Sequence, residues 1–214
     1  MPDIYIVLVG ADRVRPTATV TATILSALSP IAVSAGHPLQ VLLGPPPQRA
    51  PSSNVFTLTF TLTSSVPARQ ALGYNPRGGR SICMRGLTRP VAMGLEDGGT
   101  VFVDAFLDFR AGGGPQMTGL LLQNPTVNYA AQAVPVFQNN EPEFARAIGN
   151  TCVHELGHAI AHLGDTRDVL NFMGPATERS ASGNRDLLRT QMSCQKSFNA
   201  QQVATLQAAF RALP

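Results

Sequence analysis

The segment from 140 to 164 most constrains how this chain can fold, because it predicts one long helix with two histidines on the same face. Asn140 followed by Glu143 is the pattern of a capping box at a helix start. Apolar side chains then recur every four residues, as they do on a helix face that packs against a core. Gly164 is placed to end the helix in the left-handed conformation.

Within this helix, His154 and His158 flank Glu155 in an H-E-x-x-H arrangement. Residues four apart lie side by side on a helix, about 6 Å from each other, so both imidazoles can reach one ion. Zinc accepts nitrogen and carboxylate donors, and a catalytic zinc site leaves one position for water. Glu155 lies beside the first ligand, where its carboxylate can take a proton from that water. At average residue usage a chain of this length contains the pattern by chance about once in a hundred cases, which favours a zinc site.

The other predicted elements alternate between strands and helices. An apolar, β-branched run at 4–9 predicts a strand covered on both faces. A helical stripe begins at 17 and is predicted to stop at Pro30. Strict alternation at 54–63 predicts a strand with one apolar face. A closing helix is expected from 199, where Asn199 and Gln202 form a second capping box, and the 19 Gly and 17 Pro predict long irregular connections.

Composition excludes several classes of function. The net charge is +3 and the basic residues are scattered, so no nucleic-acid partner is expected. No run approaches the roughly 18 continuous apolar residues that span a bilayer, and no membrane partner is expected. The N-terminal segment reads as a strand and not a signal peptide, which predicts a cytoplasmic protein or a trimmed secreted domain. The sequence leaves the oligomeric state open.

Three cysteines, Cys83, Cys152 and Cys194, cannot all pair within the chain. Three thiols and one disulfide plus one thiol are both compatible with the sequence. A bridge between Cys152 and Cys194 would tie the helix that carries the histidines to the closing helix, and it stands as one hypothesis beside buried free thiols.

The stretches "HELGHAIAHLGD" and "LNFMG" resemble the zincin metallopeptidases, and more narrowly the metzincin clan, whose Met-turn the second stretch resembles. The resemblance implies an α/β fold: a twisted mixed sheet with a backing helix and an active-site helix, then a small irregular C-terminal lobe with a closing helix. It implies a single catalytic domain over 1–214, divided into 1–164 and 165–214, with one catalytic Zn²⁺ between them and a peptide or protein substrate. Met173 would be the apolar floor beneath the metal.

The third ligand departs from the clan's pattern. Metzincins usually have Gly seven residues after the first His and a third His or Asp ten after, where this chain has Ala161 and Gly164. Some related zincins carry an aspartate one residue later, in an H-E-x-x-H-x-x-x-x-L-x-D run. Asp165, eleven residues after His154, matches that form and is the predicted third ligand.

Three other side chains compete for this role. His162 continues the row of histidines but lies about 12 Å along the axis from His154, at about 1.5 Å per residue, so an intact helix cannot easily bring both to one zinc ion. Glu178 follows His158 by the separation seen in thermolysin-like enzymes, and Asp168 is a further candidate.

The resulting prediction is a zinc-dependent endopeptidase with Glu155 as general base. The alternative is a catalytically inactive zinc-binding or protein-interaction module on a zincin scaffold. A peptide is expected to bind along an edge strand, for which the run at 100–106 is the candidate. No oxyanion donor can be assigned, because Gly and Pro follow Met173 where some metzincins place a tyrosine.

Overall fold

The structure is a computed structural model. The residues that it describes are 4–51, 54–61, 86–90, 96–103, 106, 108–110, 133–135, 137–175 and 184–214.

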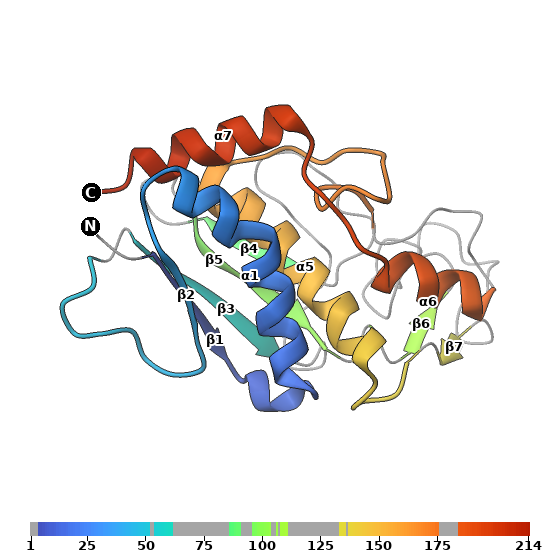
Figure 1. Ribbon diagram of the computed structural model, residues 1–214. Coiled ribbons are helices and arrows are strands. Elements are labelled where there is room, and N and C mark those ends of the chain that lie inside the picture. The colour runs from blue at the N-terminus through green and yellow to red at the C-terminus, as the bar shows by residue number, and fades with distance from the viewer. Residues whose placement is uncertain are drawn as a thin grey trace.

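A mixed five-stranded sheet forms the base of the fold, in the order β2-β1-β3-β5-β4 (Figure 1). The first four strands in this order are parallel, and β4 is antiparallel to β5. A separate antiparallel pair is made by β6 and β7. The bounds are β1 Ile4–Val9, β2 Leu39–Leu42, β3 Val55–Thr61, β4 Gly86–Pro90, β5 Glu96–Phe102, β6 Asp108–Arg110 and β7 Ala133–Pro135.

The two clearest strand predictions are confirmed. β1 is buried along its first five residues, as a strand covered on both faces requires. On β3, Phe56, Leu58 and Phe60 are buried while the threonines between them are partly exposed. The sheet therefore presents one apolar face to the helices.

The predicted edge strand is wrong. The first three residues of the run at 100–106 belong to β5, which pairs with β3 on one side and with β4 on the other. The edge of the sheet beside β5 is β4, Gly86–Pro90. The strand propensity of the β5 sequence reflects a covered central strand, with Val101 fully buried.

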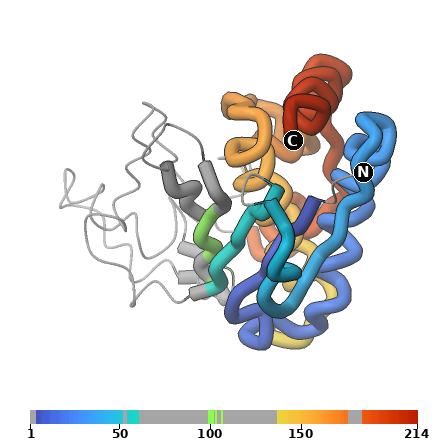
Figure 2. Tube along the Cα trace, turned by 90° about the vertical axis from the view of Figure 1, so that its left-hand side faces the viewer, coloured from blue at the N-terminus to red at the C-terminus, as the bar shows by residue number. Residues whose placement is uncertain are grey.

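Two long helices, α1 and α5, lie side by side on one face of the sheet (Figures 1 and 2). They approach closely at Gly149, where an added Cβ would lie 2.7 Å from the Cβ of Thr23. A short 3-10 turn, η1, precedes α1, and α6 and α7 follow α5. The bounds are η1 Ala11–Arg13, α1 Thr17–Ser34, α5 Pro142–Ala161, α6 Arg185–Ser193 and α7 Ala200–Arg211.

The prediction that Pro30 ends the first helix is wrong, because α1 continues to Ser34. Pro30 lies on the exposed side of the helix, while Ile31 and Ala32 belong to the buried core and anchor the last turn. By length and composition α1 could cross a membrane. Its buried side chains pack instead in the core that α1 shares with α5, β2 and α7, as those of a core helix do.

The closing helix α7 packs on both α1 and α5 (Figure 1). Its predicted capping box is confirmed: the Asn199 side chain accepts from the Gln202 amide, and the Gln202 side chain accepts from the Asn199 amide. α6 packs on α5, where the buried Asn150 side chain donates to the carbonyls of Met192 and Cys194, each at 3.0 Å. The C-terminal elements are thus fastened directly to the helix that carries the histidines.

Candidate metal centre

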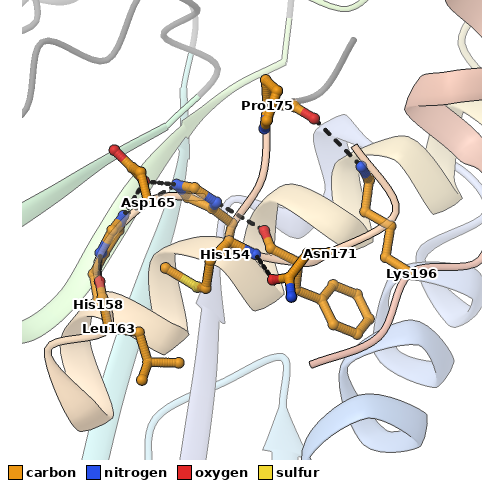
Figure 3. Close-up of polar contacts among 9 residues, drawn as sticks. His154, His158, Leu163, Asp165, Asn171, Pro175 and Lys196 are labelled. Carbon is orange, nitrogen blue, oxygen red and sulfur yellow. Dashed lines mark hydrogen bonds and ion pairs between the residues drawn. The ribbon is translucent and has the colours of Figure 1, made fainter. Parts of the chain in front are cut away.

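The two histidines of the motif project from α5 toward a common point (Figure 3). The Nε2 atoms of His154 and His158 lie 3.0 Å apart. His154 Nδ1 is 2.8 Å from the carbonyl oxygen of Phe172, and His158 Nδ1 is 2.6 Å from that of Leu163. Because a carbonyl oxygen only accepts, each ring carries a proton on Nδ1. In the neutral tautomers both Nε2 lone pairs therefore face each other, an arrangement that a cation between them relieves.

Asp165 completes the group. Its Oδ1 lies 3.5 Å from His154 Nε2 and 3.3 Å from His158 Nε2. Among the described residues, these three form a group of His, Cys, Asp and Glu side chains that could hold a metal ion, with donor atoms within 4.8 Å of one another. The Asp165 side chain is 46% exposed, against 20% and 16% for the two histidines, so the group is open to solvent on the aspartate side.

The end of α5 explains how Asp165 reaches the histidines. The prediction that Gly164 ends the helix is wrong: α5 ends at Ala161, and His162 takes the left-handed conformation with φ 51°. The amide of Leu163 then donates back to the Gly157 carbonyl at 3.2 Å. His162 and Asp165 lie eight and eleven residues after His154, each one position later than the Gly and the third ligand of the usual metzincin pattern, so the separation of three between the two positions is the same.

The predicted start of the helix is also wrong. Asn140 has φ 87° and lies outside the helix, and Glu141 is the N-cap without a side-chain capping bond. Pro142 occupies the first helical position, where its missing N–H would have had no partner within the helix. The Asn140 amide donates instead to the Arg15 carbonyl at 3.1 Å, which ties the start of α5 to the segment before α1.

The competing ligands are not brought into the group. His162 is exposed at the end of the helix, and Asp168 Oδ1 accepts from the amide of Leu170 at 2.9 Å. Neither belongs to the described group of possible metal-holding residues. Glu178 lies outside the described residues.

The charges of the group shift two pKa values. Burial acts to lower the pKa of His158, but the hydrogen bond to Asp165 and the negative charges of Glu155 and Asp165 outweigh it, so that pKa is raised. The hydrogen bond with His158 lowers the pKa of Asp165, helped by the nearby histidine charges and opposed by burial. Without a metal, the two side chains thus favour a protonated imidazole beside an ionised carboxylate.

Glu155 is 5% exposed and follows His154 directly on α5. Its negative charge also acts on Cys152, whose thiol has a raised pKa mainly because it is buried. Cys152 and Cys194 are both free cysteines, so the proposed bridge between them is absent. Cys83 lies outside the described residues.

Met173 lies under the motif helix and is fully buried. An added Cβ on Gly157 would lie 2.5 Å from the Met173 sulfur, so the glycine in H-E-L-G-H leaves space for the methionine. Met173 belongs to a turn that is fastened to the chain before α7: the Phe172 amide donates to the Ser197 carbonyl, and the Ser197 amide to the Leu170 carbonyl.

Sequence reasoning missed that the side chains of Asn171, Lys196 and Gln202 hold this turn. For Gln202 it predicted only the capping box of α7, and not the bond to the Asn171 side chain. The Lys196 ammonium is buried and donates to the carbonyls of Val169 and Pro175, at the two ends of the turn. Figure 3 shows the contact with Pro175. The sequence does contain a signal, since Lys196 is its only lysine and stands in an otherwise uncharged stretch.

The fold and site define a mixed α/β protein with a His-His-Asp group at the end of a long core helix. No protein-family model matches the sequence, and no curated protein matches it. Among solved structures, the chain is similar to archaemetzincin from Methanopyrus kandleri, with 13% sequence identity and a TM-score of 0.48. The similarity covers 98% of this chain and 96% of that one.

Proposed function

We propose that this chain is a zinc-dependent endopeptidase, with His154, His158 and Asp165 as the metal ligands and Glu155 as the general base. We further propose that 1–214 forms one catalytic domain, with 1–164 and 165–214 on the two sides of the site.

The observation that carries the proposal is the triangle of donor atoms, with edges of 3.0, 3.3 and 3.5 Å. Ligands of a tetrahedral zinc ion, with bonds of about 2.0 to 2.1 Å, are about 3.3 Å apart. Two imidazole nitrogens and one carboxylate oxygen are a donor set that zinc accepts. The residues present therefore fit the ion in both spacing and chemistry, and three protein ligands leave a fourth position open.

When bound, a zinc ion supplies Lewis acidity and lowers the pKa of water at the site toward about 7. The chain's own residues then provide binding and proton transfer. Glu155 takes a proton from the attacking water onto a carboxylate oxygen and afterwards delivers it to the nitrogen that leaves. The carbonyls of Phe172 and Leu163 keep the histidine rings oriented.

The sheet supports a peptide as the substrate. β4 is antiparallel to β5 and pairs with no further strand among those described, so its outer edge can accept an extended chain through backbone hydrogen bonds. H-E-x-x-H on a helix, with a glutamate between the ligands, is the arrangement of metallopeptidases. These two features favour peptide-bond hydrolysis over other metal-assisted hydrolyses.

The experiment combines metal analysis with activity on a broad peptide library. We expect about one zinc per wild-type chain and loss of zinc in Asp165→Ala and His158→Ala. Glu155→Gln should keep its zinc and lose about 10²- to 10⁴-fold in activity. Asp168→Ala is the matched control, because this aspartate is in the same loop but outside the group.

Two outcomes would contradict the proposal. If Asp165→Ala keeps its zinc while His162→Ala releases it, the ligand set is wrong. If Glu155→Gln cleaves peptides as fast as wild type, Glu155 is not the base. If wild type and Glu155→Gln both bind zinc and neither cleaves any peptide, the result would instead support a catalytically inactive zinc-binding module.

A further inference from the structure

The peptide group between Phe172 and Met173 connects the metal centre to the interior of the protein. Its carbonyl accepts from His154 Nδ1 at 2.8 Å, and its N–H donates to the Asn171 side-chain oxygen at 2.8 Å (Figure 3). A peptide group is planar, so whatever fixes its N–H also fixes the direction of its carbonyl. The Asn171 side chain therefore sets the direction from which His154 is held.

The Asn171 side chain is itself held by Gln202, 31 residues later in the sequence. Asn171 Nδ2 donates to Gln202 Oε1 at 2.8 Å, and both side chains are buried. The same Oε1 accepts from the backbone amide of Asn199 at 3.0 Å. Gln202 thus serves two partners at the start of α7.

These bonds have only one consistent polarity. The Asn199 amide can only donate, so the Gln202 atom facing it must be the oxygen. Because the Gln202 oxygen can only accept, the Asn171 atom that faces it must be the donor nitrogen. The Asn171 oxygen then faces the backbone amide of Met173 and accepts from it. The Phe172 carbonyl then faces His154 Nδ1 and requires a proton there, which leaves the Nε2 lone pair toward the metal position.

We propose that Gln202 is a positioning residue for the metal centre. Acting through Asn171 and the Phe172–Met173 peptide, it holds His154 in the Nδ1-protonated form that can bind metal through Nε2. We call these connected groups the Gln202 relay. Its effect on zinc rests on the proposed function, whereas its effect on the His154 tautomer does not.

The turn has a second attachment, which allows the relay to be broken without losing the turn. The Phe172 amide donates to the Ser197 carbonyl, and the Ser197 amide to the Leu170 carbonyl, at 3.1 and 3.0 Å. Neither bond involves a relay side chain. Removing the Gln202 acceptor should therefore loosen the orientation of one peptide group and leave the turn attached.

The decisive variant is Gln202→Met, which keeps the length of the side chain and removes its acceptor. Partners that orient a ligand histidine typically contribute 10- to 100-fold in metal affinity, and we expect a loss of that size. Gln202→Glu should restore most of it, because a carboxylate accepts from both partners and is favourable at the start of a helix. Affinity is measured by competition with a chromophoric zinc chelator.

The matched control is Asn199→Ala. It removes the side chain that accepts a hydrogen bond from the backbone amide of Gln202, but it keeps the backbone amide of residue 199, which donates to Gln202 Oε1. It should lower the stability of α7 and leave zinc affinity within about twofold of wild type. An effect of Gln202→Met that came only from a weakened helix would appear equally in this control.

A second readout uses the zinc-free protein. Nitrogen-15 NMR of the imidazoles distinguishes a proton on Nδ1 from one on Nε2. We expect Nδ1-protonated His154 in wild type, Gln202→Glu and Asn199→Ala, and a mixture of both forms in Gln202→Met. This readout tests the relay even if no zinc binds and the proposed function fails.

Asn171→Ala interrupts the relay at its middle and serves if Gln202→Met does not fold. The double variant Asn171→Ala/Gln202→Met should bind zinc no more weakly than Asn171→Ala alone, because both changes interrupt the same series of hydrogen bonds. The relay is overturned if Gln202→Met matches Asn199→Ala in zinc affinity and keeps His154 in one tautomer. Additive losses in the double variant would also overturn it.

Discussion

Replacing Gly157 with alanine tests how the methionine turn supports the motif helix. On an exposed helix this change stabilises by about 1 kcal/mol, because alanine loses less backbone entropy on folding. Here the new Cβ would lie 2.5 Å from the Met173 sulfur and 3.4 Å from Met173 Cε and Leu163 Cδ1. Met173 is fully buried, so its side chain must displace packed neighbours in order to move.

Overpacking of this kind costs about 1 to 3 kcal/mol. Against the propensity gain of about 1 kcal/mol, the expected net effect is a loss of up to about 2 kcal/mol in the free energy of unfolding. Met173→Ala alone should cost about 2 to 5 kcal/mol, because it leaves a cavity. In that background the clash is gone, and Gly157→Ala should become stabilising by about 1 kcal/mol.

Urea unfolding of the zinc-free wild type, both single variants and the double variant measures this cycle. Gly164→Ala is the control, since an added Cβ there has nothing within 4 Å. It should be neutral or slightly stabilising in either background. If Gly157→Ala stabilises the protein equally with and without Met173, the methionine does not fill the space beside this glycine and the packing argument fails.

Further predictions concern the same region. The raised pKa of His158 and the lowered pKa of Asp165 should stabilise the zinc-free protein most between about pH 4 and 6.5. The contribution of His158 is lost as the pH rises through the pKa of His158 in the folded protein. The contribution of Asp165 is lost as the pH falls through the pKa of Asp165 in the folded protein. Zinc must displace the His158 proton, so calorimetric titrations should find affinity rising with pH through that pKa, and a flat profile would contradict the assignment. Lys196→Met should cost about 1.5 to 3 kcal/mol per lost bond to a backbone carbonyl, and thermal unfolding close to wild type would show that the ammonium does not hold the turn.

Local rules predicted the parts of the site that lie on one element. The spacing of His154 and His158 follows from the helical repeat, and the structure brings both together. The capping box of α7 follows equally from two residues three apart, and it is confirmed. The prediction of Asp165 rests on the resemblance to zincins, because no local rule predicts that a residue beyond the end of the helix lies beside the two histidines.

The predictions of helix ends that were wrong have a common cause: contacts with distant parts of the chain determine where a helix begins and ends. Pro30 stays within α1 because the next turn is anchored in the core, and Asn140 leaves α5 because its amide bonds to Arg15. The left-handed residue that caps the end of α5 is His162 and not a glycine, which local propensity would not favour. The pairing of Asn171 with Gln202 joins residues 31 apart, and no sequence period marks it.

The buried Lys196 has a practical consequence, since it is the only lysine in the sequence. Apart from the α-amino group, an amine-acylating reagent has a single target in this chain, and that target is shielded in the folded protein. The rate of its modification would report how often the turn beside the histidines opens. Covalent labelling followed by mass spectrometry would thus give a one-site measure of local unfolding.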